Sequence, residues 1–283
     1  MRGRVAGPVV VAGLVVAGLA GALGAAGALA TRSLLRRQAA AARALIGKPL
    51  GETAHDADRV VRKRYADRGP CLELLMVGDS IAAGLGAETA KGTLGSRLAK
   101  DVAKAVKRPV RLRTVARVGS ESSMLLDQVA GLPASYRPDV AVVVVGGNDV
   151  THRVPVAESV RHLQACVRAL QERGAAVVVG TCPDLGTLQP VPQPLRALGS
   201  RASRQLAAAQ REAVLTLGAR AVSLADVVGP FFITNPDEMF SLDRFHPSSM
   251  GYHRTARAML PSVLAAVGVR DDVPFGHHAP ATR

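Results

Sequence analysis

The sequence Gly78-Asp79-Ser80 places a serine directly after an apolar run that begins at Leu72. An apolar run that breaks into glycine is typical of a buried strand ending in a turn. A serine hydroxyl becomes a good nucleophile only when a base takes its proton and hydrogen-bond donors receive the charge on the attacked carbonyl oxygen. Ser80 is therefore the candidate nucleophile, and its partners must come from elsewhere in the chain.

A carboxylate and an imidazole three residues apart, Asp243 and His246, are the candidate orienting group and base. This spacing lets Asp243 accept a hydrogen bond from one ring nitrogen of His246 while the other nitrogen faces Ser80. Asp149 and His152 repeat the spacing, so His152 is a rival base. We favour His246, because its segment follows the last predicted strand and completes the order serine, aspartate, histidine.

Three hydrogen-bond donors are the candidate oxyanion hole. They are the backbone N–H of Ser80, the backbone N–H of Gly119 and the side-chain amide of Asn148. A glycine lets the backbone come close to a ligand, and Asn148 follows a buried apolar run. Loss of one such donor typically lowers turnover about 100- to 1,000-fold.

Strand and helix patterns alternate after Pro70, which predicts a doubly wound α/β domain. The run 140–145 is apolar on both faces, as expected for a parallel sheet covered by helices on either side. Ligands of such sheets bind outside the carboxyl ends of the strands, where the candidate residues fall. The predicted strands are 72–77, 110–116, 140–145, 175–180 and 219–224, and the predicted helices are 94–106, 123–129, 156–172, 197–217 and 249–267.

Four blocks in this order resemble the SGNH, or GDSL-type, hydrolases. Gly78-Asp79-Ser80 is similar to the nucleophile block, Gly119 to the oxyanion glycine, Gly146-Gly147-Asn148-Asp149 to the asparagine block, and Asp243 with His246 to the terminal block. The resemblance covers residues 72–267. It implies a three-layer α/β/α flavodoxin-like fold with a parallel five-stranded sheet, and ester hydrolysis or acyl transfer without a metal or an organic cofactor.

The resulting hypothesis is a serine esterase or lipase-like hydrolase that acts on small-molecule or lipid esters. Two alternatives stay open: an acyltransferase that uses the same site on a glycan or lipid hydroxyl, and a non-catalytic binding domain. Phe231, Phe232, Phe240 and Phe245 closely precede His246, so they either line an acyl pocket or pack the last loop. The absence of Trp favours lipid or simple acyl esters over polysaccharide.

Composition excludes a disordered chain, since 48% of the residues are hydrophobic. The net charge is +14, but no nucleic-acid motif accompanies it, and no His, Cys, Asp and Glu cluster has the spacing of a metal site. We therefore expect neither nucleic acid nor metal as a partner. Arg97, Lys100, Lys104 and Lys107 share one helix face, which either rests on anionic lipid or is solvated. Three cysteines allow at most one disulfide.

The N-terminus carries an uncharged run over residues 5–30, which is long enough to cross a bilayer. It also fits a secretory signal that would be cleaved to release the protein. We favour a hydrophobic helix that anchors an extracytoplasmic domain, although more cations follow the run than precede it, which favours the opposite orientation. The expected organisation is an anchor or signal segment over 1–31, a basic linker over 32–70, the hydrolase domain over 71–268 and a tail over 269–283.

Overall fold

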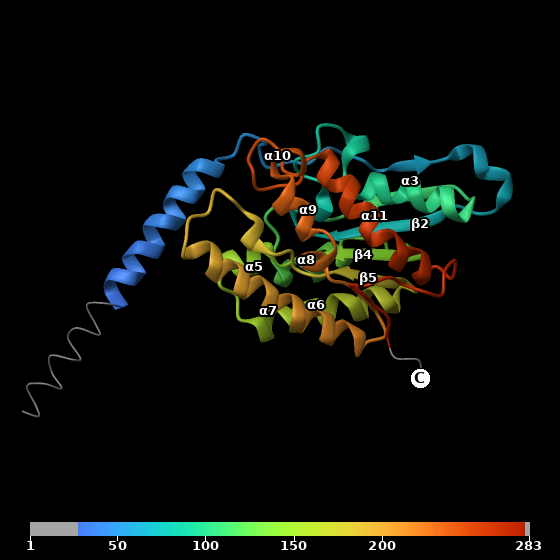
Figure 1. The fold of residues 1–283 in the computed structure, drawn as a ribbon. Coiled ribbons are helices and arrows are strands. Elements are labelled where there is room, and N and C mark those ends of the chain that lie inside the picture. The colour runs from blue at the N-terminus through green and yellow to red at the C-terminus, as the bar shows by residue number, and fades with distance from the viewer. Residues whose placement is uncertain (1–27, 281–283) are drawn as a thin grey trace, which may run out of the picture.

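The computed structural model describes residues 28–280 and has the expected α/β/α architecture, with one sheet between two layers of helices (Figure 1). The strand order is β1-β3-β2-β4-β5-β6-β7. The five inner strands are parallel and lie close to their predicted positions. They are β2 (Leu72–Gly78), β3 (Val110–Thr114), β4 (Val140–Val144), β5 (Ala176–Gly180) and β6 (Arg220–Val222).

The sheet has seven strands, so the prediction of a five-stranded, purely parallel sheet is wrong at both edges. β1 (Arg59–Val61) pairs antiparallel with β3, and β7 (His277–His278) pairs antiparallel with β6. Strands of three and two residues are too short to show an alternating pattern in the sequence. They come from the segments expected as linker and tail, and they cover the unpaired edges of the parallel strands.

The two helical layers explain why the inner strands read as continuous apolar runs. One layer consists of α3 (Leu94–Val106) and α11 (Ser249–Ala266), and the other of α4 (Leu125–Ala130), α6 (Val156–Glu172) and α7 (Leu195–Leu215). On β2, Leu74 and Met76 pack under the first layer. Leu75 and Val77 pack under the second. Both faces of the strand are therefore buried, as in other covered parallel sheets.

Short helices occupy the loops that follow the inner strands. They are α2 (Ser80–Ala83) after β2, η3 (Ser122–Met124) after β3, α5 (Gly147–His152) after β4, η4 (Leu185–Thr187) after β5, and α8 (Leu224–Val227), α9 (Gly229–Thr234) and α10 (Pro236–Met239) after β6. Two 3₁₀ turns, η1 (Lys63–Arg68) and η2 (Ala90–Gly92), lie in other connections. The polar residues predicted for the site fall in or beside these loops.

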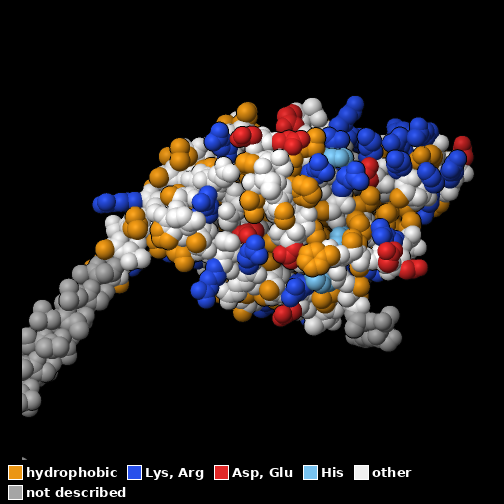
Figure 2. Space-filling view, viewed as in Figure 1, with side chains coloured by type: hydrophobic (Ala, Val, Ile, Leu, Met, Phe, Trp, Pro, Cys, Tyr) orange, Lys and Arg blue, Asp and Glu red, His pale blue; other side chains and the backbone are white. Residues whose placement is uncertain are grey.

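The N-terminal part of the described chain is a helix over residues 28–46, which extends away from the domain (Figure 1). Most of the predicted anchor falls on residues 1–27, outside the described residues. Among residues 28–280, no helix combines the length and the hydropathy needed to cross a membrane. Lys and Arg side chains gather at the α3 end of the molecule, where Lys100, Lys104 and Lys107 are exposed (Figure 2). The basic face therefore lies at the opposite end of the domain from the N-terminal helix.

Candidate active site

Ser80 is the first residue of α2 and lies just beyond the end of β2. Gly78 has a φ of 137°, and a Cβ at this position would lie 1.9 Å from the carbonyl oxygen of Val144. Only glycine fits where β2 and β4 approach so closely. The Asp79 carboxylate then caps α2 by accepting the N–H of Ile81 at 2.9 Å. These two residues fix the turn that holds Ser80.

The turn lies at the point where the strand order reverses. β3 is on one side of β2 and β4 is on the other. The loops that follow β2 and β4 diverge at such a point and leave a crevice at the carboxyl edge of the sheet. Ser80 and Asn148 enter this crevice from the two central strands, and both line the same pocket.

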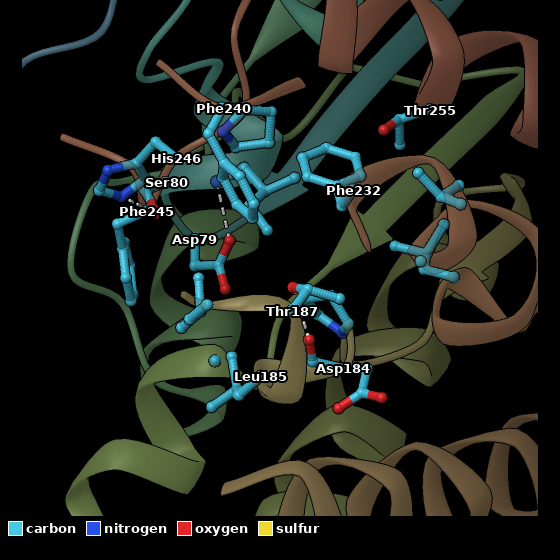
Figure 3. A pocket seen from close by; sticks show the side chains of 18 of the residues that line it. Asp79, Ser80, Asp184, Leu185, Thr187, Phe232, Phe240, Phe245, His246 and Thr255 are labelled. Carbon is cyan, nitrogen blue, oxygen red and sulfur yellow. Dashed lines mark hydrogen bonds between the residues drawn. The ribbon is translucent and has the colours of Figure 1, made fainter. Parts of the chain in front are cut away.

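Ser80, His246 and Asp243 form a chain of hydrogen bonds. Oγ of Ser80 lies 3.0 Å from Nε2 of His246 (Figure 3). Nδ1 of His246 lies 2.5 Å from Oδ2 of Asp243. The other oxygen of Asp243 accepts the backbone N–H groups of Phe245 and His246, at 3.0 and 2.9 Å. The carboxylate is thereby fixed and holds the ring with Nε2 toward the serine.

The loop that carries His246 is closed by backbone contacts. Phe240 and Pro247 form an antiparallel bridge, and the N–H of Ser241 donates to the carbonyl oxygen of His246 at 2.8 Å. Gly86, in the segment after α2, lies against this loop, and a Cβ there would be 2.4 Å from the carbonyl oxygen of Pro247. Close packing between the two loops holds the imidazole beside Ser80.

Asp243 and Asp79 are buried carboxyl groups near Ser80 that differ in their proton affinity. Burial opposes ionisation of Asp243, but hydrogen bonds from His246 and Phe245 outweigh burial and lower the pKa of Asp243 below its usual value. This carboxylate stays ionised and can stabilise a protonated imidazole. Burial raises the pKa of Asp79 to about 7, against the hydrogen bond that it accepts from Ile81. Asp79 therefore changes its charge near neutral pH.

Asn148 and Gly119 occupy different places relative to the pocket. Asn148 lines it, and its Nδ2 donates to the carbonyl oxygen of Ser120 at 2.9 Å. A side-chain amide carries two N–H groups, so one remains for a ligand. Gly119 has a φ of 80° and is exposed, and it is not among the residues that line the pocket. The structure thus brings Asn148 to Ser80's pocket and links the Gly119 loop to it through Ser120.

The rival base, His152, is paired elsewhere. Its Nδ1 lies 2.6 Å from Oε1 of Glu121 at the surface. Asp149 does not orient this ring, because both of its carboxylate oxygens accept the N–H of Ser122, at 3.2 and 3.1 Å. The repeated spacing therefore brings only one of the two histidines to Ser80, and that residue is His246.

Gln128 is a buried residue near the site that the sequence pattern did not single out. Its Oε1 accepts the N–H of Gly78 at 2.9 Å, and its Nε2 donates to the carbonyl oxygen of Gly78 at 2.9 Å and to Oγ of Ser120 at 3.0 Å. One side chain thus ties the end of β2 to the loop of Gly119. A glutamine within an amphipathic helix gives no signal of such pairing, which only the tertiary structure reveals.

An apolar pocket adjoins Ser80 and His246 (Figure 3). Of the four phenylalanines predicted near the site, Phe232, Phe240 and Phe245 line this pocket. Phe231 is instead 38% exposed, and the guanidinium of Arg254 lies over its ring. Three of the four rings therefore line a pocket, and the fourth packs outside it, so both alternatives drawn from the sequence hold for part of the cluster.

The donor groups at the site suit proton transfer and nucleophilic chemistry. Within residues 28–280 no group of three or more His, Cys, Asp and Glu side chains could hold a metal ion. Cys71, Cys166 and Cys182 are free thiols, and none of them lines the pocket. A serine, an imidazole, a carboxylate and an amide remain, which are the groups that acyl transfer requires.

Comparison with known proteins agrees with this geometry. Residues 76–254, more than half of the chain, match the GDSL-like lipase/acylhydrolase family. A GDSL-like esterase of Mycobacterium tuberculosis is 38% identical over 272 residues, which cover 93% of this chain and 86% of that protein.

Two solved structures share the fold at lower identity. The psychrotrophic esterase EstA of a Pseudoalteromonas species has a TM-score of 0.55 and 20% identity, over 69% of this chain and 98% of that protein. A catalytic mutant of an acetylxylan esterase from Geobacillus stearothermophilus has a TM-score of 0.51 and 17% identity, over 72% and 99%. The family match and the esterase relative confirm the resemblance drawn from the four sequence blocks. The chain is an ester hydrolase and belongs to the GDSL-like lipase/acylhydrolase family.

Proposed function

We propose that this enzyme hydrolyses carboxylic esters through an acyl-enzyme on Ser80, with His246 as the base and Asp243 as the orienting group. The observation that carries the proposal is the continuous hydrogen-bond chain from Oγ of Ser80 through His246 to Asp243, with heavy-atom distances of 3.0 and 2.5 Å. The distance from Oγ of Ser80 to Nε2 of His246, across which the proton moves, lies within hydrogen-bond reach of a general base. The low pKa of Asp243 supports its role as the anionic partner.

The reaction needs two proton transfers through the same imidazole. Nε2 of His246 takes the proton of Ser80 as Oγ bonds to the ester carbonyl carbon. The same nitrogen then donates this proton to the leaving alkoxide, so that an alcohol departs and the acyl group stays on Ser80. A water molecule repeats both steps, which releases a carboxylic acid and restores the serine.

The oxyanion would be held by the N–H of Ser80, the side-chain amide of Asn148 and the N–H of Gly119. Ser80 supports this role because its N–H lies in the first turn of a helix, where backbone N–H groups have no partner within the helix. Asn148 supports it through its position in the pocket. Gly119 has weaker support, since it lies outside the pocket lining and is connected through Ser120.

A panel of p-nitrophenyl esters from acetate to palmitate tests the proposal on the wild-type chain and on Ser80→Ala. We expect Ser80→Ala to lower kcat/KM at least about 1,000-fold for every ester that the wild type cleaves. If no ester shows hydrolysis that depends on Ser80, the proposal is wrong. Adding an alcohol acceptor distinguishes hydrolysis from the acyltransferase alternative. An acyltransferase would turn over faster in the presence of the acceptor and would form a new ester.

The location of the enzyme is a separate proposal. We propose that the apolar run over residues 5–30 holds the domain on the extracytoplasmic side of a membrane, because its length and lack of charge suit a bilayer span. Cleavage after Ala30 would instead give a secreted enzyme. Fractionation of cells that express the full chain, followed by N-terminal sequencing of the product, distinguishes these outcomes.

A further inference from the structure

The pocket beside Ser80 continues away from the catalytic groups along an apolar path. Phe240 and Phe232 lie between Ser80 and Thr255 (Figure 3). Leu224 and Val228 line the same cavity from the α8 side. The rings of Phe232 and Phe240 pack edge to face at 4.8 Å, which gives this wall a fixed shape. The cavity therefore offers a hydrocarbon surface that begins at the nucleophile.

The polar side chains of the cavity wall already have partners within the protein. The carboxylate of Asp184 accepts the N–H of Gly186 at 2.8 Å and pairs with Arg204. Thr187 donates to the carbonyl oxygen of Asp184 at 2.9 Å, and Thr255 donates to a carbonyl of its own helix at 2.9 Å. Away from Ser80 and Asn148, these walls therefore keep no hydroxyl donor for a sugar, and an apolar chain is the better match.

The residues that line the cavity differ in their exposure. Ile81, Asn148 and Phe245, near the nucleophile, are only half-buried. Leu224 and Thr255, at the other end, are buried. We expect a chain that enters beside Ser80 to run along Phe232 toward these buried residues, so the side chains on that path limit its length.

Gly229 lines the cavity and is buried, and it lies three positions before Phe232 on α9. A Cβ placed on Gly229 would meet no other atom within 4 Å. A buried position with open space around its missing side chain faces a hollow, so a larger residue there would extend into the cavity.

We propose that the cavity binds the alkyl chain of the acyl group and that Gly229, with Phe232, sets how long a chain it accepts. This inference rests on the proposed function, because it requires the ester carbonyl to lie at Ser80. The substrates would be esters of unbranched fatty acids whose chain ends inside the protein. Enlarging residue 229 shortens the accepted chain, and reducing residue 232 lengthens it.

The test is the ratio of kcat/KM for p-nitrophenyl hexanoate to that for the acetate, measured for Gly229→Leu and the wild type. We expect the ratio to fall at least tenfold in Gly229→Leu, because a hydrophobic pocket discriminates by factors of about 10 to 200 for each methylene that it rejects. Gly131→Leu is the matched control, since Gly131 is exposed at the end of α4 and does not line the cavity. Its ratio should stay within twofold of the wild type.

Gly229→Leu could fail to fold, because Gly229 precedes Pro230 and a side chain before proline disfavours the helical conformation. A second variant, Phe232→Leu, therefore accompanies it. In Phe232→Leu we expect the ratio of decanoate to hexanoate kcat/KM to rise about fivefold. Thermal unfolding of each variant shows whether it is folded, and if Gly229→Leu is not, the Phe232→Leu ratio decides alone. Unchanged ratios in folded variants overturn the inference. Loss of all Ser80-dependent hydrolysis in the wild type would instead defeat the proposed function.

Discussion

Asp243 is held by local contacts, because its two oxygens accept three hydrogen bonds from residues at most three positions away. The carboxylate and the imidazole thus form a self-contained turn. Only one contact of the catalytic chain, between Ser80 and His246, joins segments 166 positions apart. The pairing of Asp243 with His246 can be predicted from their spacing in the sequence. The contact of His246 with Ser80 cannot, because it depends on how the sheet and its loops bring the turn to the end of β2.

His246 and His152 have the same spacing to an aspartate and different surroundings, so they allow a direct comparison. We expect His246→Ala to lower kcat/KM for p-nitrophenyl acetate at least about 1,000-fold, because Ser80 loses the base that takes its proton. His152→Ala should stay within about threefold of the wild type, since His152 pairs with Glu121 at the surface. Steady-state kinetics of both variants decide the assignment. Near-normal turnover in His246→Ala, with loss in His152→Ala, would reverse it.

At the scale of the secondary-structure elements, the site depends on how the end of β2 is joined to the loop after β3. Gln128 makes this connection from α4 by bonding both backbone groups of Gly78 and the hydroxyl of Ser120. Asn148 completes it from α5 by bonding the carbonyl of Ser120. Two amide side chains from different helices thus hold the loop that carries Gly119 next to the end of β2, just before Ser80.

Replacing Gln128 by methionine, an apolar side chain of similar length, tests the role of this connection. We expect Gln128→Met to lower the free energy of unfolding by about 1–3 kcal/mol, because the buried N–H of Gly78 loses its partner, whereas its C=O still accepts the N–H of Arg117. We also expect Ser80 to react more than tenfold more slowly with a fluorophosphonate, because the turn before it is no longer fixed. Urea unfolding and the rate of labelling measure the two effects.

Gln171→Met is the matched control for Gln128→Met. Gln171 lies on α6 and donates to the carbonyl oxygen of Leu217 at 2.7 Å, and it does not line the pocket. Its replacement should lower stability without changing the labelling rate. Equal labelling rates in both variants would show that Gln128 stabilises the fold without positioning Ser80.

Long, buried elements could be predicted from the sequence more accurately than short ones at the edges of the sheet. The inner strands and the helices α3 and α6 were predicted closely, because buried runs and amphipathic periods extend over several residues. β1 and β7 have three and two residues and are defined by their pairing with β3 and β6. No pattern within such short segments predicts this pairing. Gln128 was missed for the same reason, since its role exists only in tertiary contacts.

At the scale of the whole molecule, two half-buried histidines and the buried Asp79 make the free energy of unfolding depend on pH in opposite directions. Burial lowers the pKa of His277 and of His278 on β7, where the two rings hydrogen-bond Ser262 and Ser223 at 2.7 and 3.0 Å. These rings favour the folded state while they are neutral, so their contribution is lost as pH falls below about 6.5. Asp79 acts in the opposite sense, because its folded-state pKa lies above the unfolded value.

Asp79→Asn isolates the second effect. The folded state holds a proton on Asp79 up to a pKa of about 7, whereas the unfolded chain releases it near its ordinary value of about 4, so the wild type loses stability as pH rises between these values. Asparagine cannot ionise and keeps an oxygen for the N–H of Ile81. We therefore expect the stability of Asp79→Asn relative to the wild type to increase with pH by up to about 1.4 kcal/mol per pH unit, and to level off above pH 7.

Urea unfolding of both proteins at pH 5, 6, 7 and 8 measures this difference directly. The contributions of His277 and His278 are present in both proteins and cancel in the comparison. A difference in unfolding free energy that stays constant over this range would mean that Asp79 is ionised throughout. The turn before Ser80 would then carry a buried negative charge at every pH at which the enzyme works, and the proton of Asp79 would have no part in its stability.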